Sequence, residues 1–250
     1  MEKNRKSVVV VGGLGRLGID FIRACKQENY KVIIIDIINK DGWNKLDLDC
    51  DLFIQADIND DKSLKDALNK IINKFNKIDS VVNTSYPRGK NFGNDVFSIS
   101  LEDFNENINL HLGGYFQVMQ QFAMYFIEQG YGNIINIASI QGIAAPKFKH
   151  YEGTNIISPI EYTAAKSAII AISRYMAKYL AGKNIRVNCI SPGGIIDNQP
   201  DSFQENYKDS CTSKGMLDTK DIVGTLLFLL SDKSKYINGQ NIIVDDGWSL

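Results

Sequence analysis

Short apolar runs of strand length alternate along the chain with longer stretches in which apolar residues recur every three or four positions. The short runs are rich in Val and Ile and have no polar face, which is typical of strands covered from both sides in a parallel sheet. The repeated switch between the two periods predicts a doubly wound α/β fold, with about seven parallel strands and helices on both faces. The expected strands are Val8–Val11, Val32–Ile35, Leu52–Ala56, Ile78–Val82, Gly132–Ser139, Ile185–Ile190 and Asn241–Val244.

The stretches between these runs predict helices, and two segments fit neither pattern. Ser100 and Asp218 are suitable N-cap residues for two of the helices. Lys147–Ser158 and Asp197–Lys214 are polar or irregular, and loops of this length in a compact domain usually bind ligands or cover a site. The expected helices are Gly15–Glu28, Asp60–Asn76, Ser100–Gln129, Pro159–Ala181 and Asp218–Leu230.

Composition narrows the class of protein. The 250 residues carry 28 basic and 29 acidic side chains, for a net charge of −1, so a nucleic-acid partner is not expected. No apolar run is long enough to span a bilayer, no hydrophobic signal segment follows Met1, and a membrane partner is not expected either. The 4 cysteines lie far apart without metal-ligand spacing, which predicts no metal site and a reducing, cytoplasmic location. The length favours a single domain over residues 1–250.

A glycine-rich segment directly follows the first expected strand. In Val11-Gly12-Gly13-Leu14-Gly15-Arg16-Leu17-Gly18, the residues Gly13, Gly15 and Gly18 form a GxGxxG pattern. Such glycines allow a tight turn, close approach of the backbone to a pyrophosphate, and close packing of the following helix. The pattern alone also fits a glycine turn without a ligand, but its place between a strand and a helix favours dinucleotide binding.

Asp36, at the end of the second strand, bears on the choice of dinucleotide. A carboxylate at this place accepts hydrogen bonds from the adenosine ribose hydroxyls and repels a 2′-phosphate. Arg16 argues the other way, because a guanidinium near the ribose could bind that phosphate, although it also fits a solvated helix residue. The sequence therefore predicts NAD in preference to NADP.

Tyr162 and Lys166 are four positions apart, which places them on one face of the expected helix. A neighbouring cation favours phenolate, so we expect the pKa of Tyr162 to be lowered and the phenol to transfer a proton. Ser139 ends an apolar strand, at the edge where open α/β sheets bind ligands. Each feature alone has an ordinary structural reading, as a surface pair or as a helix cap.

Together these residues strongly resemble the short-chain dehydrogenase/reductase superfamily, in its single-domain branch, over nearly the whole chain. The resemblance implies a Rossmann-type sheet in which Ser139 polarises the substrate carbonyl, Tyr162 transfers the proton and Lys166 binds the nicotinamide ribose. It further implies that Asn109 is the fourth catalytic residue, which holds a water in the proton relay. The implied cofactor-binding residues are Gly12, Gly13, Gly15, Arg16, Leu17, Gly18, Asp36, Asp57, Ile58, Asn83, Tyr162, Lys166, Pro192, Gly193 and Ile195.

The chain also departs from the family's pattern. The phosphate loop has Val11 and Arg16 where the family has threonine and glycine, and Tyr86 brings a large phenol near the expected active site. Ser139 and Tyr162 lie farther apart than usual, so Lys147–Ser158 resembles an insertion. A closer resemblance, carried by segments such as His111-Leu112-Gly113-Gly114-Tyr115-Phe116 and Lys214-Gly215-Met216-Leu217-Asp218, is to oxidoreductases associated with bacterial flagellin modification, which serve pathways to activated amino or nonulosonic sugars.

The resemblance implies an NAD(H)-dependent oxidoreductase that interconverts a secondary alcohol and a ketone. Tyr86, Arg88, Lys147 and Lys149 are expected near the substrate, which suggests an anionic sugar such as a sugar phosphate or nucleotide sugar; exposed loops are the plainer reading. The expected substrate loops are residues 86–95, 140–160 and 195–217. Alternatives are a sugar-nucleotide epimerase or dehydratase and a catalytically silent NAD-sensing regulator. His111 is expected to be structural and His150 to be exposed, and relatives suggest a homo-oligomer, either a tetramer or a dimer.

Overall fold

Seven parallel strands form one sheet, in the order β3-β2-β1-β4-β5-β6-β7, in the computed structural model, which describes residues 5–39, 42 and 48–250. All seven expected strands are present, with small shifts at their ends. The order reverses between β1 and β4, and such a switch point opens a crevice at the carboxyl ends of the strands. The strands are β1 (Ser7–Val11), β2 (Lys31–Asp36), β3 (Leu52–Gln55), β4 (Ser80–Asn83), β5 (Gly132–Ile137), β6 (Ile185–Pro192) and β7 (Asn241–Val244).

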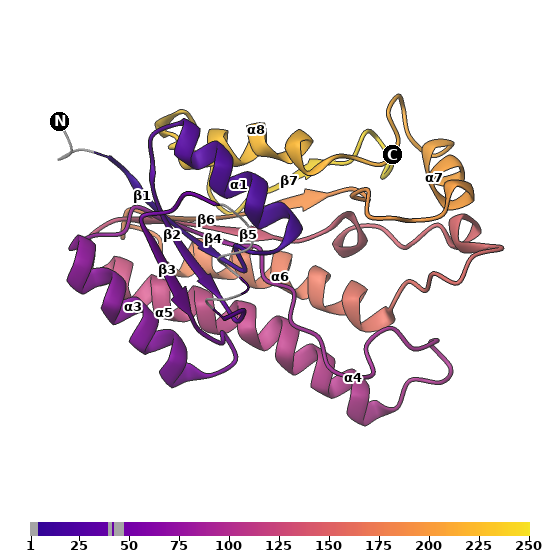
Figure 1. Cartoon of the computed structure of the whole chain (residues 1–250), viewed down its shortest axis with the longest axis horizontal. Coiled ribbons are helices and arrows are strands. Elements are labelled where there is room, and N and C mark those ends of the chain that lie inside the picture. Colours follow the sequence, from indigo (N-terminus) through magenta and orange to yellow (C-terminus); the bar gives the residue numbers. More distant parts are fainter. Residues whose placement is uncertain (1–4, 40–41, 43–47) are drawn as a thin grey trace.

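Helices cover both faces of the sheet, so the doubly wound prediction is confirmed (Figure 1). Helices α1 and α8 lie on one face, and α3, α5 and α6 lie on the other. None of the helices in the described part of the chain is long and apolar enough to cross a membrane. The helices are α1 (Arg16–Gln27), α3 (Asp61–Phe75), α4 (Leu101–Ile108), α5 (Gly114–Gln129), α6 (Ile160–Tyr179), α7 (Asp201–Lys208) and α8 (Thr219–Leu230).

One apolar core lies on each face of the sheet, between the strands and the helices. Successive side chains of a strand belong alternately to the two cores. In β1, Val10 packs with Phe21 of α1, whereas its neighbour Val9 packs in the other core with Phe122 of α5. All four side chains are fully buried. Because side chains of a strand point alternately to opposite faces, a run that is apolar at every position can supply both cores at once.

The long helix expected over Ser100–Gln129 is present but not uniform. Ser100 caps α4, and its hydroxyl accepts a hydrogen bond from the backbone N–H of Asp103 at 3.0 Å. A π-turn over Asn109–Gly113 then joins α4 to α5 without interrupting the helix. Such turns carry one extra residue and are frequent at functional sites.

The two irregular segments differ in outcome. Lys147–Ser158 is largely irregular as expected, apart from a 3₁₀ turn at Phe148–Tyr151. The loop predicted over Asp197–Lys214 is wrong in part, because it contains α7. Most of this helix is polar, and only Phe203 and Tyr207, one turn apart, are buried, so its apolar periodicity rests on two residues.

Candidate active site

The turn after β1 requires glycine at two positions for steric reasons. Gly12 has a φ of 69°, and a Cβ there would lie 2.6 Å from the backbone Cα of Ser85. A Cβ on Gly18 would lie 2.6 Å from the carbonyl oxygen of Gly13. The turn is therefore packed directly against the backbone after β4, and the N-terminus of α1 is brought close to β1, as a phosphate-binding turn requires.

A cavity of about 580 Å³, which we call the glycine-loop cavity, opens beside this turn. The Asp36 carboxylate is buried in its wall, where it accepts hydrogen bonds from the backbone N–H of Leu14 at 2.8 Å and of Ile38 at 3.1 Å. Among the described residues that line it are Gly12, Gly15, Asp36, Asp57, Ile58, Thr84, Ser85, Tyr86 and Arg88. A glycine turn, a buried carboxylate and an apolar slot together fit the pyrophosphate, ribose and adenine of a dinucleotide.

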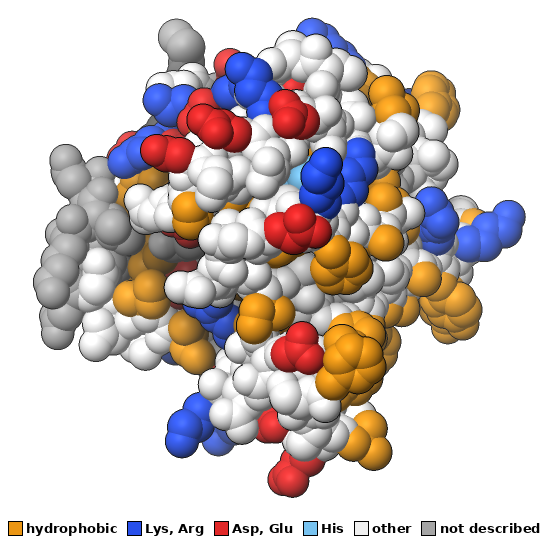
Figure 2. Space-filling model, turned by 90° about the vertical axis from the view of Figure 1, so that its right-hand side faces the viewer, with side chains coloured by type: hydrophobic (Ala, Val, Ile, Leu, Met, Phe, Trp, Pro, Cys, Tyr) orange, Lys and Arg blue, Asp and Glu red, His pale blue; other side chains and the backbone are white. Residues whose placement is uncertain are grey.

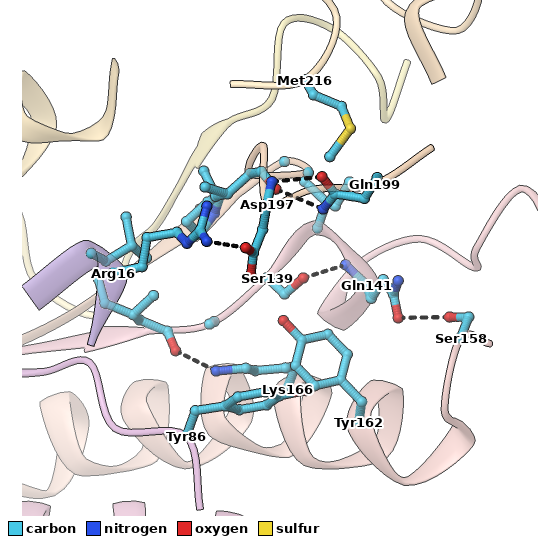
Figure 3. Close-up of a pocket in the computed structure, with 18 of the residues that line it drawn as sticks. Arg16, Tyr86, Ser139, Gln141, Ser158, Tyr162, Lys166, Asp197, Gln199 and Met216 are labelled. Carbon is cyan, nitrogen blue, oxygen red and sulfur yellow. Dashed lines mark hydrogen bonds and ion pairs between the residues drawn. The ribbon is translucent and has the colours of Figure 1, made fainter. Parts of the chain in front are cut away.

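Arg16 does not face Asp36. Its guanidinium forms an ion pair with the Asp197 carboxylate and a hydrogen bond with the carbonyl of Ile196 (Figure 3). Both side chains of the ion pair are about half exposed. Arg16 therefore links the start of α1 to the segment after β6, and it lines a second cavity next to the first.

The second cavity, of about 530 Å³, is lined by three of the four predicted catalytic residues and is called the catalytic cavity here. It shares Gly15, Thr84, Ser85 and Tyr86 with the glycine-loop cavity, so the two adjoin. Ser139, Tyr162 and Lys166 all line it and converge at the carboxyl end of β5 (Figure 3). The three side chains that the sequence predicts to form one site therefore lie together in the structure.

Ser139 serves both as a cap and as a site residue. Its hydroxyl accepts a hydrogen bond from the backbone N–H of Gln141 at 3.1 Å, which caps a 3₁₀ turn, and it is also hydrogen-bonded to the Tyr162 phenol. The two readings of Ser139 that the sequence left open are thus compatible. The cap fixes the hydroxyl beside the phenol.

Burial determines the protonation of the Tyr162 and Lys166 pair. Desolvation raises the pKa of Tyr162, against the opposing effect of the hydrogen bond with Ser139. Desolvation also lowers the pKa of Lys166 to about 7. The expectation that the lysine charge lowers the pKa of Tyr162 is therefore wrong for the ligand-free protein, because the same burial that isolates the pair disfavours both charged forms.

Lys166 is held in an aromatic cage. Its ammonium donates a hydrogen bond to the Ile137 carbonyl at 2.8 Å, and lies 5.1 Å from the ring centre of Tyr115, 5.6 Å from Tyr162 and 6.0 Å from Tyr86. Cation–π attraction partly offsets the loss of hydration. The Tyr115 hydroxyl also donates to the Ile137 carbonyl, at 3.0 Å, and so ties α5 to the end of β5.

The remaining residues predicted to bind the cofactor divide into two groups. Leu17, Pro192, Gly193 and Ile195 line the catalytic cavity. Gly13, Gly18 and Asn83 line neither cavity; the Asn83 side-chain oxygen instead accepts from the Ser85 N–H at 3.1 Å and shapes the turn after β4. Their place in the structure is behind the binding surface.

The predicted fourth catalytic position is displaced. Asn109 begins the π-turn, but it is exposed and lines neither cavity. Two residues later, His111 is buried and its ring packs against the rings of Tyr86, Tyr115 and Tyr162. The helix turns between these positions, so the two side chains leave on different sides. The structure thus places His111 beside Tyr162 and Asn109 away from it.

The four residues predicted to contact substrate also separate. Tyr86 lines both cavities, and Arg88 lines the glycine-loop cavity while stacking on the Tyr86 ring at 5.3 Å. Lys147 and Lys149 line neither cavity. The Lys147 ammonium instead donates to the Trp248 carbonyl at 2.7 Å and lies over the Trp248 ring. The cations of the inserted segment therefore do not line the site.

The outer wall of the catalytic cavity is aromatic and was missed by sequence reasoning. Phe203 and Tyr207 of α7 pack with Met216 and Trp248 in one cluster, and all four line the cavity. His150, expected to be exposed, is buried behind this wall, where its Nε2 is 2.8 Å from the Ser210 hydroxyl. The spacing of Phe203 and Tyr207 was the one signal available. The other contacts join segments far apart in the chain.

Two amide side chains line the catalytic cavity beside its hydroxyl and charged groups. Gln141 accepts a hydrogen bond from the Ser158 hydroxyl at 3.1 Å, and Gln199 donates to the Ile195 carbonyl at 3.0 Å (Figure 3). On the surface seen in Figure 2, basic and acidic side chains are interspersed around orange hydrophobic groups, with no broad patch of one charge. No cluster of potential metal ligands occurs in the described ranges.

Comparison with known proteins agrees with this geometry. The family described as Enoyl-(Acyl carrier protein) reductase matches residues 17–249. The post-translational flagellin modification protein A of Campylobacter coli is 43% identical over 98% of both chains. A 3-oxoacyl-(acyl-carrier-protein) reductase of Thermotoga maritima is 31% identical over 76% of this chain and 74% of its own.

A solved structure supports the same placement. The short chain dehydrogenase of Leptospira borgpetersenii, determined with bound NAD+, is 31% identical and superposes with a TM-score of 0.87, covering 99% of this chain and 94% of its own. These likenesses cover nearly the full length of the chain. The glycine turn and the meeting of Ser139, Tyr162 and Lys166 point to the same family. The chain belongs to the short-chain dehydrogenase/reductase family of NAD(P)-dependent oxidoreductases acting on CH–OH groups.

Proposed function

We propose that the protein is an NAD(H)-dependent oxidoreductase that interconverts a secondary alcohol and a ketone on a sugar substrate. The observation that carries this proposal is the meeting of Ser139, Tyr162 and Lys166 where the catalytic cavity adjoins the glycine-loop cavity. A substrate oxygen placed between Ser139 and Tyr162 would lie next to the end of a dinucleotide that extends from the glycine turn.

The chain's own residues supply the proton and orient the substrate. The bound nicotinamide would accept or deliver the hydride. The Tyr162 hydroxyl gives its proton to the carbonyl oxygen in reduction, and in oxidation the Tyr162 phenolate takes the proton of the alcohol. The Ser139 hydroxyl stabilises the substrate oxygen by a hydrogen bond. Because burial raises the pKa of Tyr162, the phenol of the ligand-free site is protonated and ready for ketone reduction.

The placement of Arg16 supports NAD as the cofactor. Arg16 is engaged with Asp197 and lines the other cavity, so it does not offset the negative charge of Asp36. A carboxylate buried in the wall where a ribose would lie opposes a 2′-phosphate by repulsion and by desolvation. Arg88 lines the glycine-loop cavity, and its positive charge can pair with the pyrophosphate of the cofactor.

The aromatic wall and the amides support a sugar as the substrate. Aromatic rings of the lining, such as those of Phe203 and Tyr151, can pack on the C–H face of a sugar, while Gln141 and Gln199 can exchange hydrogen bonds with its hydroxyls. The relative named for flagellin modification points in the same direction. Lys147 and Lys149 give no support to an anionic group at this end, so a phosphate or nucleotide part of the substrate would depend on other contacts.

Two other functions remain to be separated by experiment. An epimerase or dehydratase of this chemistry uses the same Tyr–Lys pair but returns the hydride, so NAD(H) would not be consumed. A silent NAD-sensing regulator would bind NAD and turn over nothing. Net consumption of NADH with a panel of keto sugars, sugar phosphates and nucleotide sugars supports the oxidoreductase over both.

The proposed mechanism is tested by Tyr162→Phe. The variant keeps the ring and removes the proton carrier, so turnover should fall by about 10²–10⁴-fold. Binding of NAD, measured by titration calorimetry, should remain within about threefold. Lys166→Ala should weaken both, because the ammonium serves cofactor and phenol. Retention of more than about a tenth of the activity by Tyr162→Phe would rule out this mechanism.

We also propose a cytoplasmic homo-oligomer, either a tetramer or a dimer. Helices α5 and α6 expose large apolar side chains, including Met124 on α5 and Tyr175 and Tyr179 on α6. Burying such residues between copies would remove apolar surface from water. Light scattering coupled to gel filtration measures the assembly directly. A monomer at micromolar concentration would contradict this part of the proposal.

A further inference from the structure

An ion pair crosses the carboxyl edge of the sheet at the catalytic cavity. Arg16 is the first residue of α1, which follows β1, and Asp197 lies in the segment that follows β6. In the sheet, β4 and β5 lie between β1 and β6. The ion pair of Arg16 and Asp197, which we call the strap, therefore spans the ends of two strands.

The catalytic cavity lies beneath the strap. Thr84 and Ala138, which directly follow β4 and β5, line this cavity together with the two residues of the strap. Figure 3 shows the strap on one side of Ser139 and the Tyr162 ring on the other. The cavity thus lies between the strap and the ends of these two strands.

Both ends of the strap are held by neighbouring backbone groups. The Arg16 guanidinium binds the Asp197 carboxylate and also the carbonyl of Ile196. The Ile196 N–H in turn donates to the Leu217 carbonyl at 2.9 Å. The Asp197 N–H donates to Gln199 Oε1 at 2.6 Å. Two acceptors on adjacent, fixed residues therefore orient a single guanidinium.

The strap is a surface contact and not a support of the core. The Arg16 side chain is 47% exposed and the Asp197 side chain is 53% exposed. Water and salt screen such a pair, so it adds little to the stability of the fold and opens readily. This is the behaviour needed in a contact that opens and closes repeatedly.

A dinucleotide bound along the two cavities would pass beneath the strap. Its adenosine would lie near Asp36 in the glycine-loop cavity, and its nicotinamide near Tyr162 in the catalytic cavity. The residues shared by the two cavities include Gly15, which directly precedes Arg16. The middle of the dinucleotide would therefore lie between the strap and the sheet. Because NAD has a wide ring system at each end, it can be laid sideways into the site only when the strap is open.

We propose that the strap gates the exchange of NAD(H): the ion pair of Arg16 and Asp197 opens to admit or release the cofactor and closes over it in between. The pair is made by the chain's own residues and needs no cofactor, so its closing adds a barrier in both directions without favouring the bound state. The strap therefore governs the rates of binding and release and not the affinity. This inference rests on the proposed function, because it takes the cofactor to lie along both cavities.

Stopped-flow fluorescence of NADH measures both rates without any substrate. In Asp197→Asn the side chain keeps its size and loses its charge. The rate constants of NADH binding and release should therefore both rise by about two- to fivefold, the range expected for breaking an exposed ion pair. The dissociation constant should stay within about twofold of the wild type.

Further variants test the pair from its other side. Arg16→Gln makes the opposite change in charge and should speed both rates as much as Asp197→Asn does, and the double variant should not exceed either one. Added salt should speed release from the wild type and leave release from the double variant unchanged. Arg23→Ala is the matched control, because Arg23 forms an ion pair with Asp20 on the same helix but lines neither cavity. Its rates should equal those of the wild type.

Three results would overturn the inference. A direct contact of Arg16 with the pyrophosphate would weaken NADH binding in Arg16→Gln, whereas Asp197→Asn would free Arg16 and tighten it. Faster binding with slower release in Asp197→Asn would show the effect of a lost negative charge alone. Wild-type rates in both variants would show that the strap does not lie on the path of the cofactor.

The inference and the proposed function fail in different ways. Wild-type exchange rates in the strap variants, together with loss of turnover in Tyr162→Phe, would overturn the inference alone. Failure of NADH to bind the wild type would overturn the proposed function and this inference with it.

Discussion

The two adjoining cavities differ in how their walls are built. The glycine-loop cavity takes its wall largely from turns that directly follow β1, β2, β3 and β4, so strand register fixes each residue. The outer wall of the catalytic cavity comes from α7, the inserted segment and the C-terminal residues. A wall made at strand ends is determined locally, whereas one made by packed loops depends on contacts between distant parts of the chain.

The largest effect is expected in the locally determined half, at Gly12. Gly12→Ala should weaken NAD binding by at least about 100-fold, because its Cβ would collide with the backbone of Ser85 and displace the turn. Gly182→Ala is the matched control, since Gly182 also has a positive φ, of 79°, but no atom lies within 4 Å of the added Cβ. Titration calorimetry should find NAD binding within about twofold of wild type in the control. Equal losses in the two variants would show that backbone strain, and not the collision, matters.

Cofactor choice should respond next, at Asp36. The wild type should bind NAD at least about tenfold more tightly than NADP, which corresponds to about 1.4 kcal/mol. Asp36→Ala removes the carboxylate that repels a 2′-phosphate, so the two affinities should approach each other. Calorimetry with both cofactors measures the ratio. If the wild type prefers NADP, or the variant keeps the preference, the role assigned to Asp36 is wrong.

The smallest effects are expected in the distant half, where two side chains can be set against each other. Phe203→Ala removes part of the aromatic wall and should raise KM for a sugar substrate by about tenfold. Lys149→Ala should change KM by less than about twofold at any ionic strength, because Lys149 lines neither cavity. Initial rates at low and high salt make the comparison. A KM increase in Lys149→Ala that disappears with salt would restore the anion-binding reading of the inserted segment.

Sequence reasoning predicted most of the fold because the strands are apolar on both faces. Val8–Val11 is apolar at every position and so lacks the polar side of an amphipathic helix. The sequence therefore predicts a buried strand there. The same holds for Asp36 and Gly12, which are fixed by the strands before them. Prediction failed at α7, where six of eight positions are not buried and the helix is identified only by its packing.

The site was predicted less evenly, for a physical reason. Ser139, Tyr162 and Lys166 follow from one strand end and one helix face. Asn109 and His111 are both polar and two positions apart, and which of them turns inward depends on the extra residue of the π-turn. Lys147 was expected near the substrate, but a carbonyl and a ring near the C-terminus bind its ammonium. No local pattern reports such a contact.

The π-turn also constrains how this chain can change in length. A π-turn is equivalent to a single residue inserted into an α-helix, so a one-codon deletion within Asn109–Gly113 would restore regular α-helix. One residue corresponds to a rotation of about 100°, which would turn α4 relative to α5. The Asn107 side chain would then lose its 2.7 Å hydrogen bond with the Gly89 N–H, and the His111 ring would lose its contact with the Tyr162 ring. Homologous chains that lack this residue should therefore differ together at the loop around Gly89 and at the imidazole position, as one inherited unit.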